Sequence, residues 1–536
     1  MLFWLLFSFF LVAFGQPAWV PGFGLFAGCL GFALFWRSMF FFPRARDRFL
    51  LAILWFGAVQ GIQLSWMTST LYMGPLILFV YLFLLLGLGI QFACLSFLVQ
   101  PPLDFRRCLA IAGVWVCFEW VRLYFLTGFT WNPVGLALVD SPLSLQWASL
   151  FGIYGLSFWV ILVNLTALKA FFLEKTKRNI AIWAFLALLP YGYGFLHLHW
   201  IERSHPSSKN LSVALVQTGL LPEQKDYQKR YAHVFIPPLE QWERILRCLK
   251  EEKKVDLIVL PEASFPYGAY RDLFPFHLVK AFWIDFFGEE AIRDFPPIQA
   301  PFGNSHSVNN TFLAQALANH FQADVILGLD DHDLKKDAKY NAAFYFSPQG
   351  NSPVRYEKRV LVPATEYVPL KSWKFIARFL REEFGIGDAF EPGTEVKIFQ
   401  ACIPIGVSIC IEEIYSGLTR DLRKSGAELF VNLSNDVWFP SSRLPQQHFD
   451  HGRVRAVENG VYIVRACNTG ITGGVDCFGR PLACLPVSET KAEALYLSLP
   501  IRSYHTLYTW WGDQAILGFS VLSIAFGFLG RKKKLP

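Results

Sequence analysis

The chain has 536 residues, of which 53% are hydrophobic and 17% charged, and its formal net charge is +7. Soluble domains carry about 25% charged residues. The composition therefore excludes a disordered chain, a collagen-like fibre and a small disulfide scaffold, and it argues against a wholly soluble enzyme. Aromatic residues are abundant, with 53 Phe, 18 Trp and 19 Tyr, as expected of a protein that contacts lipid.

Apolar stretches predict eight membrane-spanning helices, seven within residues 1–200 and one within residues 513–536. A bilayer core of about 30 Å needs about 20 apolar helical residues. The expected spans are 2–14, 18–36, 49–71, 76–99, 108–126, 145–171, 180–199 and 513–530. Gly15, Gln16 and Pro17 cut the first one short, so a re-entrant or interfacial helix is its alternative. It lacks the basic start and the small-residue cleavage site of a signal peptide.

Basic residues alternate between the loops and predict the orientation. Cytoplasmic loops are enriched in Lys and Arg. Such residues cluster within 37–48, 106–107, 175–178 and 531–534, whereas loops 72–75 and 127–144 contain none. This alternation places both termini in the cytoplasm and residues 201–512 outside. Because the clusters lie at membrane ends and not on one face of a folded domain, no nucleic-acid partner is expected.

Residues 201–512 predict a layered α/β domain. Residues 227–254 and 445–459 have helical spacing, and Pro237–Pro238 must break or kink the first segment. Strands that alternate with helices indicate a layered arrangement. Short runs that read as buried strands are Leu211–Gln217, Val255–Leu260, Asp324–Leu329, Ala342–Phe346, Ile403–Cys410, Glu428–Leu433, Val461–Arg465 and Ala494–Leu499.

Residues 265–302 hold an unusual density of Phe, Tyr and Trp for a soluble domain. One interpretation is buried core. The other is a lid that dips into the bilayer beside a lipid-binding cleft, with its aromatic side chains at the interface. The sequence favours neither.

Cysteine and histidine spacing predicts no metal site and no cofactor. The ten Cys form no CxxC pair and no zinc-type spacing with His. Six of them lie in the exported segment, where disulfides are permitted, and the sequence does not say which of them pair. His448 and His451 have helical spacing but no clear carboxylate as a third ligand, so we interpret them as surface polar residues. GxSxG and Walker A motifs are absent.

Three segments bring together groups that could carry chemistry. Cys410 ends an apolar strand, Glu262 follows another strand, and Lys358 lies in the segment EKRVLVPATEYVP at 357–369. Taken singly, the thiol reads as a buried structural cysteine and each charge as a solvated surface group. Together they offer a thiol, a base and a cation, and the first two lie at strand ends, where an α/β sheet presents reactive groups.

These residues resemble the Glu–Lys–Cys triad of the nitrilase superfamily, and the flanking spans narrow the resemblance to the apolipoprotein N-acyltransferase family. The resemblance covers nearly the whole chain: 1–200 as the membrane domain, 201–512 as the catalytic domain, and 513–536 as a last span with a basic tail. It implies an αββα sandwich, which agrees with the strand count. The motifs that carry it are PEASFP at 261–266, the segment at 357–369, SNDVWF at 434–439, and the matches at 447–448, 455–458 and 468–470.

The resemblance implies acyl transfer on the outer face of a bacterial inner membrane, and we expect the enzyme to be a monomer. A phospholipid would donate its acyl chain to the thiol, and the acyl group would pass to the α-amino group of the S-diacylglyceryl cysteine of an apolipoprotein. The implied roles are Cys410 as nucleophile, Glu262 as general base, Lys358 as oxyanion stabiliser, Glu366 and Glu412 as supporting carboxylates, and Trp438 as a substrate-binding aromatic.

The chain departs from the family pattern at three positions. Ile411 follows the nucleophile where Tyr is usual, so a ring hydrogen bond is lost while the backbone N–H remains. Pro440 replaces a Gly and stiffens its loop. Asp226 follows Lys225 where Trp is usual, which puts an early substrate contact in doubt.

Two other functions remain open at this point. One is a membrane-tethered, nitrilase-like amidase with a soluble substrate, and the other is a transport or scaffold protein with an inactive nitrilase-like domain. The membrane spans favour the transferase. A lipid substrate leaves the bilayer at a cost of about 0.8 kcal/mol per exposed CH₂, so catalysis at the interface avoids extracting it.

Overall fold

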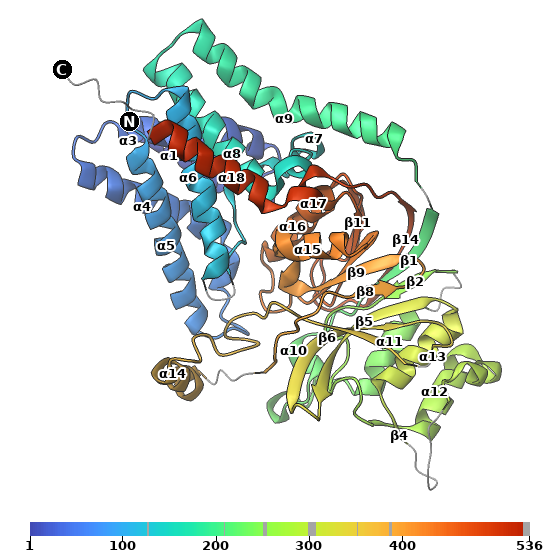
Figure 1. The fold of residues 1–536 in the computed structure, drawn as a ribbon. Coiled ribbons are helices and arrows are strands. Elements are labelled where there is room, and N and C mark those ends of the chain that lie inside the picture. The colour runs from blue at the N-terminus through green and yellow to red at the C-terminus, as the bar shows by residue number, and fades with distance from the viewer. Residues whose placement is uncertain are drawn as a thin grey trace.

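The computed structural model describes residues 1–125, 128–207, 209–249, 254–297, 307–350, 352–384 and 389–528. A helical domain and a two-sheet domain pack side by side (Figure 1). The basic run 531–534 lies outside the described residues.

Helices occur at all eight positions where spans were expected. Helix α8 occupies the centre of the helical domain, since nearly all its side chains are buried, and α18 packs along α6. The helices are α1 (Leu2–Ala13), α2 (Phe23–Phe26) continued through a π-turn by α3 (Phe32–Met39), α4 (Ala45–Gln63), α5 (Leu76–Leu98), α6 (Phe105–Val121), α8 (Ala148–Leu168), α9 (Lys177–Ser204) and α18 (Asp513–Phe528).

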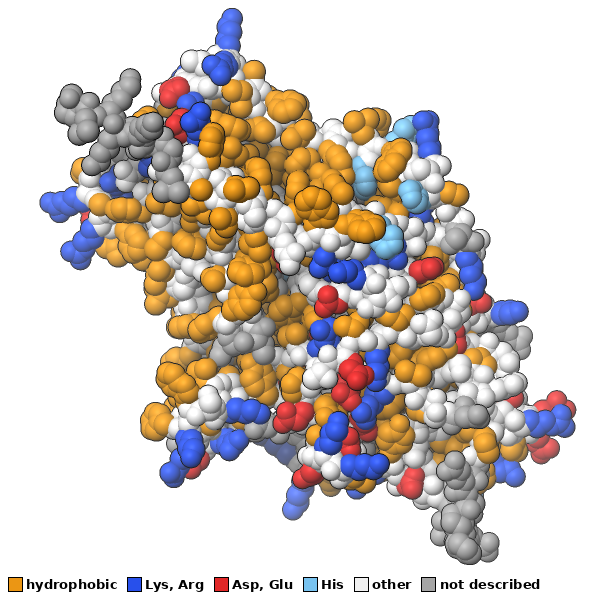
Figure 2. Space-filling model, in the orientation of Figure 1, with side chains coloured by type: hydrophobic (Ala, Val, Ile, Leu, Met, Phe, Trp, Pro, Cys, Tyr) orange, Lys and Arg blue, Asp and Glu red, His pale blue; other side chains and the backbone are white. Residues whose placement is uncertain are grey.

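Three of these helices are long and apolar enough to cross a membrane: Leu76–Leu98, Ala148–Leu173 and Lys177–Ser204. Leu2–Ala13, Phe23–Met39 and Asp513–Phe528 are apolar but shorter. The count of eight crossings therefore stays a prediction. Hydrophobic side chains cover much of the visible face of the helical domain, whereas charged side chains are more frequent over the sheets (Figure 2).

The second domain contains two six-stranded sheets. In the first, β1, β2 and β5 are parallel, and in the second, β9, β10 and β11 are parallel. The first sheet has the order β14 (Glu493–Ile501), β1 (Lys209–Gln217), β2 (Leu257–Val259), β5 (Asp324–Asp333), β6 (Ala338–Phe346), β7 (Val354–Glu357). The second has the order β13 (Pro481–Cys484), β12 (Gly473–Val475), β11 (Tyr462–Cys467), β10 (Leu429–Ser434), β9 (Pro404–Ile409), β8 (Ile398–Gln400).

Alternation along the strands builds three layers of core. Leu211, Val213 and Leu215 of β1 belong to the core between the two sheets, whereas Ala214 and Val216 belong to the core under the outer helices, because successive strand side chains point to opposite faces. The predicted αββα sandwich is confirmed. Its outer helices are α11 (Pro238–Leu249), α12 (Phe276–Phe287) and α13 (Asn310–Phe321) on the first sheet and α15 (Ser416–Lys424) and α16 (Leu444–Asn459) on the second.

All eight predicted strands are present, and α16 matches the predicted helix 445–459. Within 227–254 the α-helix begins only at Pro238. Before the proline pair there is a single three-residue turn, Lys229–Tyr231, so the helix predicted for 227–236 is wrong. Strands β7, β8, β12 and β13 were missed. Each has only three or four residues, too few to show an alternation.

The aromatic residues of 265–302 are mostly core. Phe265, Phe274 and Trp283 are buried and pack with α13, and α12 lies at the far end of the sandwich from the helical domain (Figure 1). For these residues the buried-core interpretation is correct and the membrane lid is wrong. Phe302 lies outside the described residues. Exposed aromatic side chains occur instead around α14 (Lys374–Phe384), where Phe375 is 83% exposed.

The two domains share one hydrophobic core. Ile414, Tyr415, Val454 and Val457 of the sandwich are buried in the same cluster as the helical domain. Helix α8 is kinked at Gly152, whose φ of +65° suits glycine, and the backbone N–H of Ile153 there donates to Oε1 of Glu458 at 2.8 Å (buried side chain of α16). The helical domain is thus fixed against the elements that follow β9.

Candidate active site

A buried lysine lies between two carboxylates. Nζ of Lys358, just after β7, donates to Oε1 of Glu262 at 3.0 Å and to Oε1 of Glu366 at 2.9 Å. Glu262 follows β2, so two strand ends of the first sheet meet here. Lys358 is only 1% exposed. Burial opposes its charge, but Glu262 and Glu366 outweigh burial and raise the pKa of Lys358 well above its usual value. The side chain is therefore an ammonium.

Asn341 of β6 fixes the same two carboxylates. Its Nδ2 donates to Oε1 of Glu262 at 2.7 Å and to Oε1 of Glu366 at 2.9 Å. Its carbonyl oxygen accepts the backbone N–H of Lys358 at 2.8 Å. The other oxygen of Glu366 accepts the N–H of Val362 at 2.7 Å. Asn341 thus orients Glu262, Lys358 and Glu366 together.

Cys410 begins a tight turn, Cys410–Ile414, at the end of β9. Its φ is +51°, a conformation that non-glycine residues adopt rarely and that is concentrated at functional sites. Burial raises the pKa of the Cys410 thiol, as does the negative charge of Glu262, while Lys358 opposes them. The resting sulfur is therefore a protonated thiol, and its activation needs a base.

Glu412 joins the nucleophile strand to the lysine loop. Its carboxylate accepts the hydroxyl of Tyr356 at 3.0 Å, the N–H of Arg359 at 2.6 Å and the N–H of Ile409 at 2.8 Å. Burial raises the pKa of Glu412, although these backbone N–H groups oppose the rise. The side chain therefore ties the residues flanking Lys358 to the residue before Cys410.

Trp438 lies on an exposed loop after β10 and is 41% exposed. Its ring meets the ring of Tyr72 edge-on, with centroids 6.4 Å apart. The Tyr72 hydroxyl, from the loop between α4 and α5, donates to Glu223 at 3.2 Å. Trp438 therefore lies where the two domains meet. Pro440 follows in the same turn.

The other departures from the family pattern also have a place in the structure. Ile411 packs against the hydrophobic core of the helical domain. A tyrosine at this position would need a hydrogen-bond partner for its buried hydroxyl. Nζ of Lys225 donates to the carbonyl of Ala263, the residue after Glu262. Lys225 thus holds the backbone next to Glu262, although the residue that follows Lys225 is Asp226 and not Trp.

His448 and His451 are not surface residues, because each is only 1% exposed. Asp436 and the carbonyl of Cys410 flank the His448 ring, and His451 contacts the carbonyl of Trp131. The surface interpretation is therefore wrong. Among the described residues no group of three or more His, Cys, Asp or Glu is arranged to hold a metal ion. All ten cysteines are unpaired.

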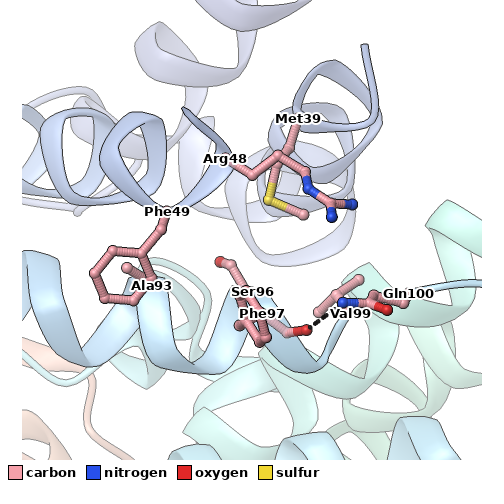
Figure 3. A pocket seen from close by; sticks show the side chains of 8 residues that line it. All are labelled: Met39, Arg48, Phe49, Ala93, Ser96, Phe97, Val99 and Gln100. Atoms are coloured by element: carbon pink, nitrogen blue, oxygen red, sulfur yellow. Dashed lines mark hydrogen bonds between the residues drawn. The ribbon is translucent and has the colours of Figure 1, made fainter. Parts of the chain in front are cut away.

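A small pocket in the helical domain lies apart from these residues (Figure 3). Its volume of about 10 Å³ is that of a single water molecule. Arg48 and Gln100 line it, and Nε2 of Gln100 donates to the carbonyl of Phe97. It is too small to hold a substrate.

Sequence reasoning found the charged residues of the site and missed two neutral ones, Asn341 and Tyr356. Asn341 precedes the predicted strand Ala342–Phe346, and an amide beside such an apolar run is a signal that it serves a partner. Tyr356 lies in β7, which was too short to recognise.

Comparisons with known proteins identify the family. Residues 213–490 match the carbon-nitrogen hydrolase family, and residues 8–166 match the apolipoprotein N-acyltransferase N-terminal domain. The chain is 33% identical to the apolipoprotein N-acyltransferase of Chlamydia pneumoniae over 98% of its own length and 96% of the relative's. The corresponding protein of Chlamydia caviae is 32% identical over 98% of each.

Solved structures similar to the chain include Nit3 of Saccharomyces cerevisiae, described as a member of branch 10 of the nitrilase superfamily. It is 21% identical, with a TM-score of 0.35, over 61% of this chain and 98% of Nit3. The two domain matches and the near full-length relatives carry the assignment. The chain belongs to the apolipoprotein N-acyltransferase family.

Proposed function

We propose that the protein transfers an acyl chain from a phospholipid, through a thioester on Cys410, to the α-amino group of the N-terminal S-diacylglyceryl cysteine of a lipoprotein. The observation that carries this proposal is the Lys358 ammonium held between Glu262 and Glu366 beside the turn of Cys410. The relatives' name supplies the lipoprotein acceptor.

The first half-reaction forms the thioester. Sγ of Cys410 attacks the ester carbonyl of the phospholipid while Glu262 takes the thiol proton, which the raised pKa of Cys410 requires. An ammonium has three N–H donors. Two go to Glu262 and Glu366, so one remains for the oxyanion, together with the backbone N–H of Ile411. When the C–O bond breaks, Glu262 returns the proton to the lysophospholipid alkoxide.

The second half-reaction releases the product. The α-amine of the acceptor attacks the thioester carbonyl, and Glu262 accepts a proton from the nitrogen. The C–S bond then breaks, Glu262 returns that proton to the Cys410 thiolate and the amide product departs, so the chain is unchanged after one cycle. Glu366 and Glu412 touch no reacting atom in this scheme. They position Lys358 and the Cys410 strand through the hydrogen bonds described above.

Transfer is favoured over hydrolysis of a small amide by what surrounds the nucleophile. Ile411 and Tyr415, on either side of the turn, pack against the core of the helical domain. A site built against apolar helices suits acyl chains that stay in the bilayer, because each exposed CH₂ costs about 0.8 kcal/mol. Trp438, exposed where the domains meet, is the proposed substrate contact.

We place residues 1–200 and 513–536 in the bacterial inner membrane with both termini cytoplasmic, and residues 201–512 on the periplasmic face. The support is the alternation of basic loops and the three helices of spanning length and composition. The protein would act as a monomer.

The test uses the full chain in lipid nanodiscs with a phospholipid labelled in its acyl chain and a diacylglyceryl lipopeptide. We expect labelled N-acyl lipopeptide and its loss in Cys410→Ala, with Cys248→Ala as the matched control. Labelled free fatty acid without N-acyl product would indicate a hydrolase. Unchanged function of Cys410→Ala would indicate a scaffold.

A further inference from the structure

The ring of His448 lies between groups that all favour a positive charge. Its Nδ1 is 3.0 Å from Oδ1 of Asp436, and its Nε2 is 3.1 Å from the carbonyl oxygen of Cys410. A carbonyl oxygen only accepts hydrogen bonds, and so does an ionised carboxylate. The same Oδ1 also accepts the hydroxyl of Ser434 at 3.2 Å. Both ring nitrogens must therefore donate.

Two further neighbours agree. Oε2 of Glu413, in the turn that Cys410 begins, lies 3.7 Å from Nε2 of His448. The ring of Trp131, from the helical domain, lies 5.5 Å from the imidazole centroid, within the range of a cation–π contact. Arg465 is an opposing cation, but it is paired with Glu413 and donates to the backbone carbonyl of His448. His451 on the same helix adds no opposing charge at pH 7, because burial lowers its pKa to about 3.

The carbonyl that His448 contacts belongs to Cys410, whose backbone has a conformation that is unfavourable for a non-glycine residue. Cys410 has a φ of +51°, and its carbonyl accepts from His448 and from Nδ2 of Asn432 at 3.2 Å. The peptide plane of that carbonyl also carries the N–H of Ile411. Fixing the oxygen therefore fixes the direction of the N–H that the proposed oxyanion would use.

The opposite side of the site repeats the arrangement. Ala263, next to Glu262, has a φ of +43°, and its carbonyl accepts from the buried ammonium of Lys225. A buried side-chain donor thus holds the carbonyl of a positive-φ residue beside the base as well as at the nucleophile.

We propose that His448 is a positioning residue for the nucleophile: a buried imidazolium, held by Asp436 and Trp131, that grips the carbonyl of Cys410 and fixes the turn presenting the thiol and the Ile411 N–H. Burial and Glu262 raise the pKa of the Cys410 thiol most, and Asp436 raises it further; an imidazolium beside Asp436 would oppose that last effect. This inference rests on the proposed role of Cys410, but its test does not require acyl transfer.

The protonation state is measured directly by ¹⁵N NMR of the full chain, labelled in its 11 histidines, in nanodiscs. The His448 signal is assigned by its loss in His448→Gln. We expect both ring nitrogens to be protonated at pH 7. A neutral His448 ring at pH 7 would overturn the proposal.

Alkylation of Cys410 by iodoacetamide, followed by peptide mass analysis, reports the thiol without any substrate. In His448→Asn, which can still reach Asp436 but not the Cys410 carbonyl, we expect alkylation about tenfold slower, since loss of a neighbouring opposite charge shifts a pKa by about one unit or more. Adding Asp436→Asn to this variant should restore most of the rate.

His451→Gln is the matched control, because His451 is equally buried on the same helix and contacts Trp131 but not Cys410. It should lower the thermal midpoint without slowing alkylation. Equal alkylation rates in His448→Asn and His451→Gln would overturn the positioning role. If wild-type Cys410 forms no acyl adduct while these alkylation results hold, the proposed function fails and the His448 inference stands.

Discussion

Lys358 forms an ion pair with Glu262 and with Glu366. Replacing Lys358 by Met removes the cation that both carboxylates share. The wild-type set of three carries one positive and two negative charges, all nearly excluded from water. Breaking a buried ion pair by deleting one partner costs about 3–5 kcal/mol of unfolding free energy. Lys358→Met should lose that much stability, because the two carboxylates then keep only neutral donors, the Asn341 amide and the Val362 N–H.

Glu366→Gln supplies the compensation. By itself it leaves Lys358 paired with Glu262 and should cost about 1 kcal/mol, the scale of one hydrogen bond. In the double variant only one carboxylate remains unpaired. The combined loss should therefore be smaller than the sum of the single losses by about 2 kcal/mol, within the range of coupling between residues in contact.

Activity should not follow stability. The oxyanion donor is absent in both Lys358→Met variants, so the rate of acyl-enzyme formation should fall about 100- to 1000-fold in each. Denaturant unfolding in detergent and single-turnover mass analysis measure the two quantities. Lys371→Met is the control, since that lysine is 56% exposed and 4.0 Å from Glu391. Additive stability losses, or activity restored in the double variant, would refute the reasoning.

Three further predictions concern the surroundings of the site. Gly328→Ala should slow thioester formation at least about tenfold in single-turnover assays, because its Cβ would lie 2.6 Å from Cα of Glu262. Gly417→Ala is the control and should be neutral, since a Cβ there would meet nothing within 4 Å. Equal rates for the two variants would contradict the role of the close approach. Burial raises the pKa of Asp330 to about 6. Since this folded pKa lies above the unfolded one, ionisation of Asp330 destabilises the protein as pH rises through about 4 to 6. Asp330→Asn should therefore add about 1–2 kcal/mol to the free energy of unfolding at pH 8 but little at pH 4. Thermal melts that show no pH-dependent difference between variant and wild type would contradict this. Trp438→Ala should raise the half-saturating substrate concentration several-fold in steady-state assays and leave thiol alkylation unchanged; altered alkylation would indicate core packing instead.

The sequence was sufficient to predict candidate site residues that carry reactive groups and follow recognisable apolar strands. Glu262 and Cys410 follow apolar runs that predict strands, and the structure has β2 and β9 before them, whereas β7, the strand before Lys358, was not recognised. The alternation of strands and helices predicted a layered α/β domain, and the family resemblance supplied the αββα order. Apolar stretches likewise located helices at all eight expected positions.

What the sequence could not supply depends on packing between distant segments. Asn341 matters because β6 lies between the elements that carry Glu262 and Lys358, which only the sheet order determines. We interpreted His448 as a surface residue from the sequence. Helix α16 is buried on nearly all sides between the two domains, so its sequence has no polar face that would show which residues point to solvent. The aromatic run at 265–302 was ambiguous for the same reason, since burial against α13 is not a property of the segment itself.

The central claim is that Cys410 carries the acyl group. Its most direct test is mass analysis of the intact full-length protein, and of its peptides, after exposure to phospholipid without an acceptor. The account predicts an added mass of one acyl chain on the peptide containing Cys410, removed when a diacylglyceryl lipopeptide is added. An adduct on another of the ten cysteines, or N-acylated product formed with no adduct at Cys410 at any time, would contradict it.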